Sequence, residues 1–170
     1  ARPLGSVSAT TAGSAVRLGG PATLVEYGPL AAANGDTVQV PRSLRVDGTA
    51  VVTLTPDSTL AVGGDLLGTT RNPGAFRPRG TVLFNGAGTA AAPQRFEAMS
   101  ADLGPGSAAF TNNFALGSLV VGANTVVRLV NSADNAPGAG AEAVYTNALV
   151  VPAGSTLDLN GLRLYARAVL

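Results

Sequence analysis

The chain has 170 residues, with 22 glycines and 11 prolines, and it contains no histidine, cysteine or tryptophan. It also lacks lysine, so all 11 basic residues are arginines, and the ten acids leave a net charge of +1. These absences exclude disulfides, thiolate nucleophiles, Schiff-base lysines, lysine isopeptide cross-links and the usual zinc sites. The balanced charge gives no excess of basic residues of the kind that binds nucleic acid or an anionic membrane. No apolar run is long enough to predict membrane insertion.

The chain is expected to contain one main domain preceded by a short arm. Residues 1–15 are small and show no clear period, so they are interpreted as an N-terminal arm or joining strand. Residues 16–170 are expected to form a single domain. Its pattern breaks at about 99–113, and the segment 131–142, rich in Ala, Gly, Asn and Pro, is interpreted as a loop insertion.

An apolar pair with i, i+2 spacing recurs every 22 positions in the first half of the chain. The pairs are Val16/Leu18, Val38/Val40, Leu60/Val62 and Val82/Phe84. Such a pair marks one face of a β-strand, and a fixed period of this length indicates a repeat array. Thr37, Thr59 and Thr81 share the period and are expected to stack as a ladder on the outer side of the same wall.

Two further columns follow the same period. One contains Ala22/Leu24, Leu44/Val46 and Leu66/Gly68 and fades at Gly88/Ala90; the other contains Leu30/Ala32, Val52/Leu54, Phe76 and Phe96/Ala98. The expected fold class is therefore all-β: a single-stranded right-handed β-helix (β-solenoid) with three short strands per coil of about 22 residues. Ordering the backbone of a coil costs roughly 1–2 kcal/mol per residue in conformational entropy. Coils are therefore expected to depend on stacking against their neighbours for stability.

A second repeat, with apolar residues at i, i+2, i+8 and i+10, occupies the later part of the chain. Its two copies are Leu119, Val121, Val127, Leu129 and Leu149, Val151, Leu157, Leu159. Leu44, Val46, Val52 and Leu54 have the same spacing. The later part is therefore expected to use the same strand–arc–strand unit as the first.

The segments 117–122 (GSLVVG) and 149–161 (LVVPAGSTLDLNG) resemble repeats of secreted bacterial β-solenoid proteins, such as autotransporter passengers and planctomycete surface proteins. The resemblance is best over about 114–170. It implies an extracellular or cell-surface location and a scaffold or adhesive role, and it implies no catalytic residues.

Three groups of charged or polar residues are candidate sites. The acids Asp47, Asp57, Asp65 and Asp158 could pair as in a polysaccharide hydrolase, but turn-capping is favoured. Asn131, Ser132, Asp134, Asn135 and Glu142 offer oxygen ligands for calcium but lack known calcium-loop spacing, and neither a metal nor a cofactor is expected. Arg71, Arg77 and Arg79 could bind an acidic partner or polysaccharide, although a solvated loop paired with nearby Asp is favoured.

The two ends of the repeat array carry the leading functional hypothesis. Neither end shows an amphipathic helix that would cover it, and 162–170 reads as an alternating strand finishing on Val and Leu. We expect a non-enzymatic extracellular subunit that polymerises head-to-tail with itself into a fibre or surface layer. The alternatives are an adhesin or glycan-binding module, with extracellular polysaccharide as partner, and a β-helical carbohydrate-active enzyme. The expected joint involves Leu4, Val7, Val16, Leu18, Leu162, Leu164, Tyr165, Val169 and Leu170.

Overall fold

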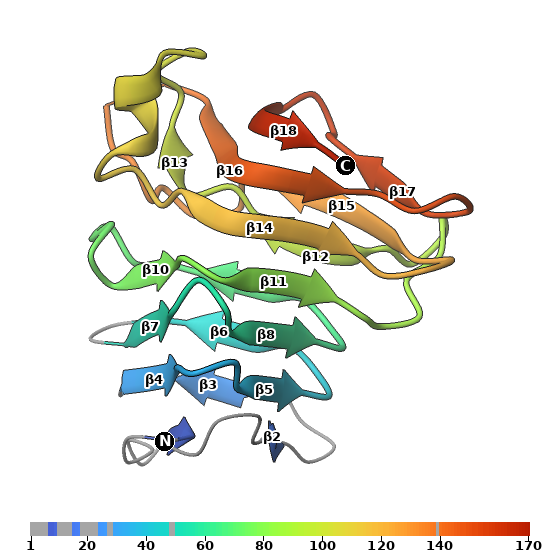
Figure 1. Ribbon diagram of the computed structural model, residues 1–170. Helices are drawn as coiled ribbons and strands as arrows, with labels where there is room; N and C mark the ends of the chain where they lie inside the picture. The colour runs from blue at the N-terminus through green and yellow to red at the C-terminus, as the bar shows by residue number, and fades with distance from the viewer. Residues whose placement is uncertain (1–6, 10–14, 18–23, 27–28, 48–49, 139) are drawn as a thin grey trace.

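The computed structural model describes residues 7–9, 15–17, 24–26, 29–47, 50–138 and 140–170, with side chains from Leu30 onward. Within these ranges the chain is all-β, apart from one 3₁₀ turn, η1 (Ser107–Phe110). Figure 1 shows short strands stacked in layers, with the N-terminal strands at one end and the C-terminal strands at the other.

The strands form three sheets. Sheet A contains β1 (Val7–Ala9), β4 (Pro29–Ala32), β7 (Val51–Leu54) and β10 (Phe76–Pro78). Sheet B contains β2 (Ala15–Arg17), β5 (Thr37–Val40), β8 (Thr59–Val62), β11 (Thr81–Phe84), β13 (Ser100–Ala101), β14 (Leu116–Val121), β16 (Glu142–Val150) and β18 (Arg163–Val169). Sheet C contains β3 (Leu24–Glu26), β6 (Leu44–Val46), β9 (Leu66–Gly68), β12 (Gln94–Glu97), β15 (Val126–Val130) and β17 (Thr156–Asp158). The pairing is parallel throughout, except that β13 is antiparallel to β16.

The 22-residue period of the sequence is the register of sheet B. Val38 lies opposite Leu60, and Leu60 lies opposite Val82, with all three fully buried. Thr37, Thr59 and Thr81 are also direct partners and are only half-buried, since neighbouring residues of a strand point to opposite faces. The predicted inner column and threonine ladder are therefore confirmed for these strands.

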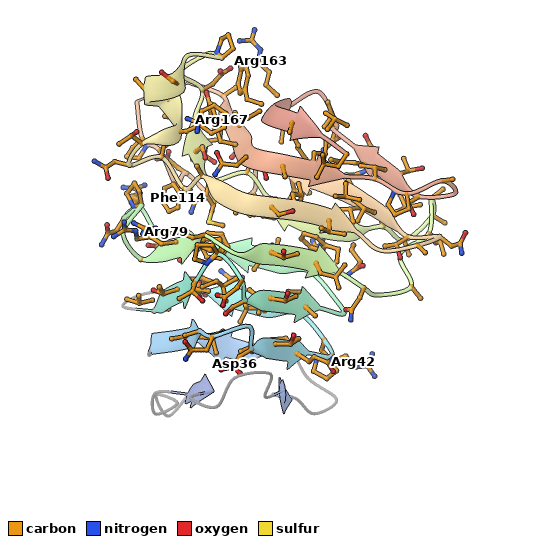
Figure 2. All side chains as sticks on the ribbon, viewed as in Figure 1. Asp36, Arg42, Arg79, Phe114, Arg163 and Arg167 are labelled. Carbon is orange, nitrogen blue, oxygen red and sulfur yellow. The ribbon has the colours of Figure 1, made fainter. Side chains whose placement is uncertain are left out.

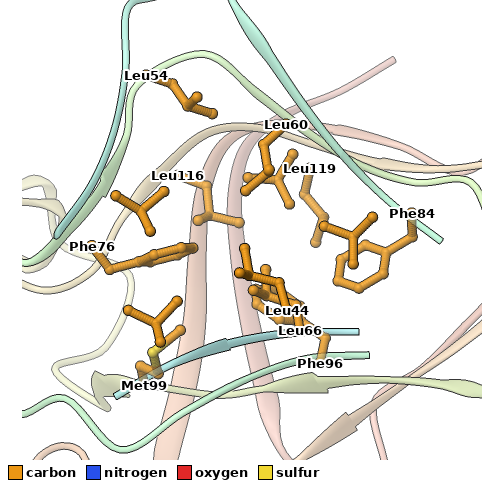
Figure 3. Packing of buried hydrophobic residues seen from close by; sticks show 14 of the residues in the cluster. Leu44, Leu54, Leu60, Leu66, Phe76, Phe84, Phe96, Met99, Leu116 and Leu119 are labelled. Atoms are coloured by element: carbon orange, nitrogen blue, oxygen red, sulfur yellow. The ribbon is translucent and has the colours of Figure 1, made fainter. Parts of the chain in front are cut away.

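One continuous apolar core lies between the sheets. Leu60 and Leu119 project into it from sheet B, while Leu44, Leu66 and Phe96 project from the opposite side (Figure 3). Phe84 and Phe96 bring the corner of sheets B and C together, with ring centroids 5.2 Å apart. Since each fully buried aliphatic or aromatic side chain contributes about 1.5–3 kcal/mol, the core accounts for much of the stacking energy.

The sequence assigned Phe96 to the wrong column. It was expected above Phe76, but it pairs with Leu66 in sheet C, where Gly88 and Ala90 had been expected. The chain between β11 and β12 makes an extra excursion, closed by a turn in which Thr89 N donates to Ala92 O (3.0 Å) and Ala92 N to Thr89 O (3.1 Å). This excursion delays the next strand, so Phe96 follows Leu66 after 30 residues rather than 22.

The first layers also differ from the expected register. Leu24 pairs with Leu44, which lies twenty residues later, whereas the 22-residue period predicts Ala22 as the partner of Leu44. Ala22 itself lies outside the described residues. Val7–Ala9, expected in an N-terminal arm, forms β1 and pairs in parallel with β4. These residues therefore extend sheet A within the same chain.

The later layers keep the predicted second repeat but not three short strands per coil. Leu119 pairs with Leu149, and Val127 with Leu157, so the late repeat of thirty residues is confirmed. The spacing shared with Leu44–Leu54 is not the same unit, because β6 and β7 lie in sheets C and A, whereas β14 and β15 lie in sheets B and C. Sheet A stops at β10, and the chain after β12 instead forms β13 and η1.

The inner column of sheet B provides a test of the packing. Leu60→Asp should destabilise the protein by about 4 kcal/mol or more, because it places an unpaired charge among apolar neighbours. Thr59→Val, one position away on the outer face, should change stability by no more than about 0.5 kcal/mol. Urea unfolding followed by circular dichroism measures both. Similar effects of the two substitutions would contradict the assignment of inner and outer faces.

Candidate functional site: the C-terminal end of the stack

Two edge strands form the C-terminal end of the stack. β18 pairs with β16, β17 pairs with β15, and among the described residues no strand pairs with the outer edge of either. Leu170 N donates to Leu149 O at 2.9 Å, so alternation along the strand directs the Val169 N–H to the outer edge of β18. An edge with unpaired backbone groups of this kind can accept a further strand.

The apolar core is partly open at this end. Leu119 and Val127 are fully buried in the layer below, whereas their partners Leu149 and Leu157 are only partly buried. Leu162 and Leu164 also pack on the core while remaining partly accessible. Val169 and Leu170 are 73% and 77% exposed. The end therefore combines an unpaired strand edge with accessible apolar side chains.

The residues predicted for the joint have different positions. Leu162, Leu164, Val169 and Leu170 lie on or beside β18, at this end. The strands that contain Val7 and Val16, β1 and β2, are the first strands of sheets A and B, at the opposite end of the stack (Figure 1). Leu4 and Leu18 lie outside the described residues.

Tyr165 belongs to an internal brace that the sequence did not reveal. Its ring stacks on that of Tyr145 (centroids 4.8 Å apart), and Phe110 of η1 meets Tyr145 edge-on at 5.0 Å. Tyr165 Oη donates to Asp102 Oδ1 (2.8 Å), and Arg163 Nη1 donates to Asp102 Oδ2 (3.0 Å). The segment after β13 thus holds the outer face of β16 and β18.

The contacts of this brace also change the pKa of Asp102. The hydrogen bond from the Tyr165 hydroxyl lowers the pKa of the Asp102 carboxyl, and the Gly104 amide and the Arg163 guanidinium act in the same direction. Arg167 lies over the Phe110 ring at 4.3 Å, a cation–π contact. In Figure 2, Arg163 and Arg167 both lie beside the β13–η1 segment. The contacts join residues about sixty positions apart, so no short-range motif could predict them.

The loop considered for calcium is held by two buried glutamates. Glu97 Oε1 accepts hydrogen bonds from Ser132 N (2.5 Å) and Ala133 N (3.0 Å), and its Oε2 accepts from Ser132 Oγ. Glu142 Oε1 accepts from Ala136 N (2.5 Å), and its Oε2 accepts from Asn131 Nδ2 (2.6 Å) when that amide is turned to match its neighbours. The loop's own N–H groups therefore satisfy both carboxylates, and the described residues contain no cluster of three potential metal-ligating His, Cys, Asp or Glu side chains. Glu97 was not among the predicted residues.

The acids weighed as catalytic are each bonded to a nearby side chain. Asp65 accepts from Arg95 (2.7 Å), Asp158 from Arg128 (2.6 Å) and Asp57 from the Thr55 hydroxyl (2.6 Å). Asp47 bonds Arg45 and the Thr69 hydroxyl. The hydrogen bond from Arg128 lowers the pKa of Asp158. Among the described contacts, the expected local turn cap is found for Asp158 alone, whose Oδ1 accepts from Asn160 N at 2.9 Å; Asp47, Asp57 and Asp65 instead bond other side chains.

The arginine cluster is divided by the fold. Arg71 donates to Asp134 Oδ2 at 3.0 Å and so contacts the 131–141 loop. Arg77 and Arg79 instead line a hollow beside β10.

Comparison with known proteins gives no match: no family model, curated protein or solved structure is significantly similar to this chain. Within the described ranges, no helix has the length and apolarity needed to cross a membrane.

Asp102→Asn tests the brace through its pH dependence. Because the folded-state pKa of Asp102 is lowered, its ionised form contributes stability above the unfolded value of about 3.9, and this contribution is lost as the pH falls through the folded-state pKa. The variant should have a lower Tm than the wild type at pH 7, and the difference should shrink towards pH 2. Asp57→Asn changes the same charge outside the brace and is the matched control for the loss of one carboxylate at each pH. A pH-independent Tm difference for Asp102→Asn would contradict the electrostatic role.

Glu142→Gln should have the opposite pH dependence. Burial raises the pKa of the Glu142 carboxyl, and the nearby acids Glu97 and Asp134 add to the effect. Ionised Glu142 therefore costs stability at neutral pH, and the cost disappears as the pH falls through the raised pKa towards the unfolded value of about 4.3. Glu142→Gln keeps an acceptor for Ala136 N and should be at least as stable as the wild type at pH 7. Glu142→Ala, which leaves Ala136 N without this partner, should lower Tm at every pH; equal Tm losses in both variants would argue against the burial cost.

Proposed function

We propose that this protein is a structural subunit of the extracellular space or cell surface, in which a closed right-handed β-solenoid assembles head-to-tail with copies of itself. The observation that carries the proposal is the end formed by β17 and β18, where a strand edge that no described strand pairs with lies beside partly accessible leucines. The resemblance of 117–122 and 149–161 to secreted bacterial solenoid repeats supports the location and the scaffold role.

The parallel stack favours an open polymer over a closed pair. Apart from β13, the strands of each sheet run in the same direction, so the two ends of the stack present different surfaces. A contact between two different surfaces is heterologous, and repeated heterologous contacts give filaments unless the rotation closes a ring. The N-terminal edge of a second copy is therefore the proposed occupant of the β18 edge.

The local geometry of β18 suits strand addition. Its outer edge carries the Val169 N–H, and the last two residues expose apolar side chains that a neighbouring layer would bury. Within one chain the same combination of main-chain pairing and apolar stacking joins β16 to β18. Addition of a strand from another molecule would reproduce this arrangement at the joint.

A non-catalytic role is supported by the ion pairs and hydrogen bonds of the four aspartates that could have been catalytic. Asp47, Asp65 and Asp158 are engaged by arginines, and Asp57 by a hydroxyl. Paired catalytic carboxylates instead face one another across a substrate cleft at roughly 5–9.5 Å.

Val169→Pro tests the joint. Proline removes the N–H that faces the outer edge, while edge positions of this kind tolerate it, so the folded subunit should keep its stability within about 1 kcal/mol. The wild type should sediment as concentration-dependent polymers at micromolar concentration, and Val169→Pro as a monomer. Val169→Thr, which keeps the N–H and the β-branched shape, should still polymerise. A clean monomer for the wild-type chain under native conditions would refute the proposed assembly.

A further inference from the structure

An open hollow of about 620 Å³ lies on the side of the stack, beside β10. The 110–117 segment, Arg77 and Arg79 line it, and Asn147 of β16 contributes an amide. Figure 2 shows Arg79 and Phe114 on this side of the molecule, apart from the C-terminal end. Its volume is within the range of small-molecule clefts, about 300–1,000 Å³.

The hollow exists because sheet A stops at β10. The chain next crosses the end of β10 where β14, a strand of sheet B, begins at Leu116; there Ser118 N donates to Gly80 O at 3.0 Å. Gly117 fits against the Arg79 carbonyl, where an added Cβ would lie only 1.7 Å from the oxygen. The edge of β10 before this crossing therefore remains open, and the 110–115 segment forms the other side.

Two cations that have no partner among the described residues face this space. Arg77 and Arg79 are exposed and two residues apart, so both project from the outer face of the strand, while Phe76 and Pro78 are buried. Neither guanidinium makes a hydrogen bond or ion pair within the described part of the chain, whereas five other arginines are paired with aspartates. No acidic residue lines the hollow. The site is therefore cationic and its charge is not neutralised locally.

The rim is held in an uncommon backbone conformation. Asn112 and Phe114 have φ values of 52° and 53°, in the left-handed region that side chains rarely adopt. The buried Asn113 between them stabilises this geometry, since its Nδ2 donates to Ala101 O (2.9 Å) and Ala109 O (2.8 Å). Such conformations cost of order 1–3 kcal/mol and persist where surrounding contacts determine them. Here they present Thr111 and Asn112 to the solvent at the edge of the hollow.

We propose that this hollow binds an acidic polysaccharide, with Arg77 and Arg79 pairing with the carboxylate or sulfate groups of the sugar chain. The amides of Asn112 and Asn147 and the hydroxyl of Thr111 supply donors and acceptors for neutral sugar hydroxyls. Recognition rests on charge and hydrogen bonding, because Phe76 and Phe114 are buried, and the half-buried Phe110 ring already packs against Arg167 (4.3 Å) and Tyr145 (5.0 Å).

A peptide strand is a poorer occupant of the same place. Ala75 O accepts a hydrogen bond from β7, and Arg79 N donates one to it. Because backbone groups alternate between the two edges of a strand, the N and C=O groups of Phe76 and Pro78 face the open edge of β10. Pro78 has no N–H, and the Gly80 carbonyl is taken by Ser118. A peptide added here would find little of a hydrogen-bonding ladder, whereas a polysaccharide needs none.

Affinity electrophoresis and calorimetry with the full chain test the proposal. The probes are polygalacturonate for carboxylates, dextran sulfate for sulfates, unmodified dextran as the neutral control and polyglutamate as the acidic-peptide control. The Arg77→Gln/Arg79→Gln double variant should weaken binding to the preferred acidic polysaccharide at least about tenfold, the loss expected when two charge-assisted contacts disappear. Added salt should weaken wild-type binding, since exposed charges are screened.

Arg42→Gln is the matched control for the single variants Arg77→Gln and Arg79→Gln, because each of the three substitutions removes one positive charge. Arg42 is also exposed but does not line the hollow, and it lies near the N-terminal layers in Figure 2. Its substitution should leave affinity within about twofold, while each single variant in the hollow should lose more. Binding of polygalacturonate identifies uronic acids, and binding of dextran sulfate alone identifies sulfated sugars. Equal losses in Arg42→Gln, equally tight binding of dextran or polyglutamate, or no binding of either acidic polysaccharide would overturn the proposal.

Discussion

The structure depends on the direct stacking of equivalent residues in successive parallel layers. Val38, Leu60 and Val82 are partners in sheet B, and Leu44 and Leu66 in sheet C, so each layer covers the apolar side chains of the one below. A single layer orders too many residues for the apolar area it buries alone. Stability is therefore shared between neighbours, and the last layer leaves part of its apolar surface accessible. The proposed assembly follows from this constraint.

A second consequence appears where the stacking is interrupted. Sheet A ends at β10, and the chain that would have formed its next strand leaves the wall as β13 and η1. This excursion covers the outer face of β16 through the Phe110, Tyr145 and Tyr165 rings. It also leaves the edge of β10 open, which creates the cationic hollow. One interruption thus stabilises the last layers and provides a recess on an otherwise regular wall.

The charged residues on the stacked layers differ from those beside the interruption at β10. Elsewhere on the walls, arginines and aspartates neutralise one another, as in the Arg95–Asp65 and Arg128–Asp158 pairs, which link positions thirty residues apart in neighbouring layers. Exposed pairs of this type contribute little energy individually, about 0–1 kcal/mol, but they leave little unbalanced charge on the walls. Arg77 and Arg79 differ from these residues: they have no such partner among the described residues, and they lie on β10, the last strand of sheet A, or directly after it.

The sequence by itself determined the strand-forming residues and the stacking columns of the regular layers, because a parallel ladder places residues one period apart directly opposite each other. It also indicated the open edge at Leu162–Leu170, since alternation can be read locally. It misplaced Phe96, because the excursion at 85–93 lengthens the spacing to 30 residues, and Leu24, because the spacing to Leu44 is only 20 residues; neither change alters the local pattern. Only the tertiary structure decided that Asp102 meets Tyr165, that Glu97 and Glu142 hold one loop, and that Arg77 and Arg79 separate from Arg71. Those contacts join residues tens of positions apart, and their geometry depends on where the irregular segments fold back, which no local periodicity encodes.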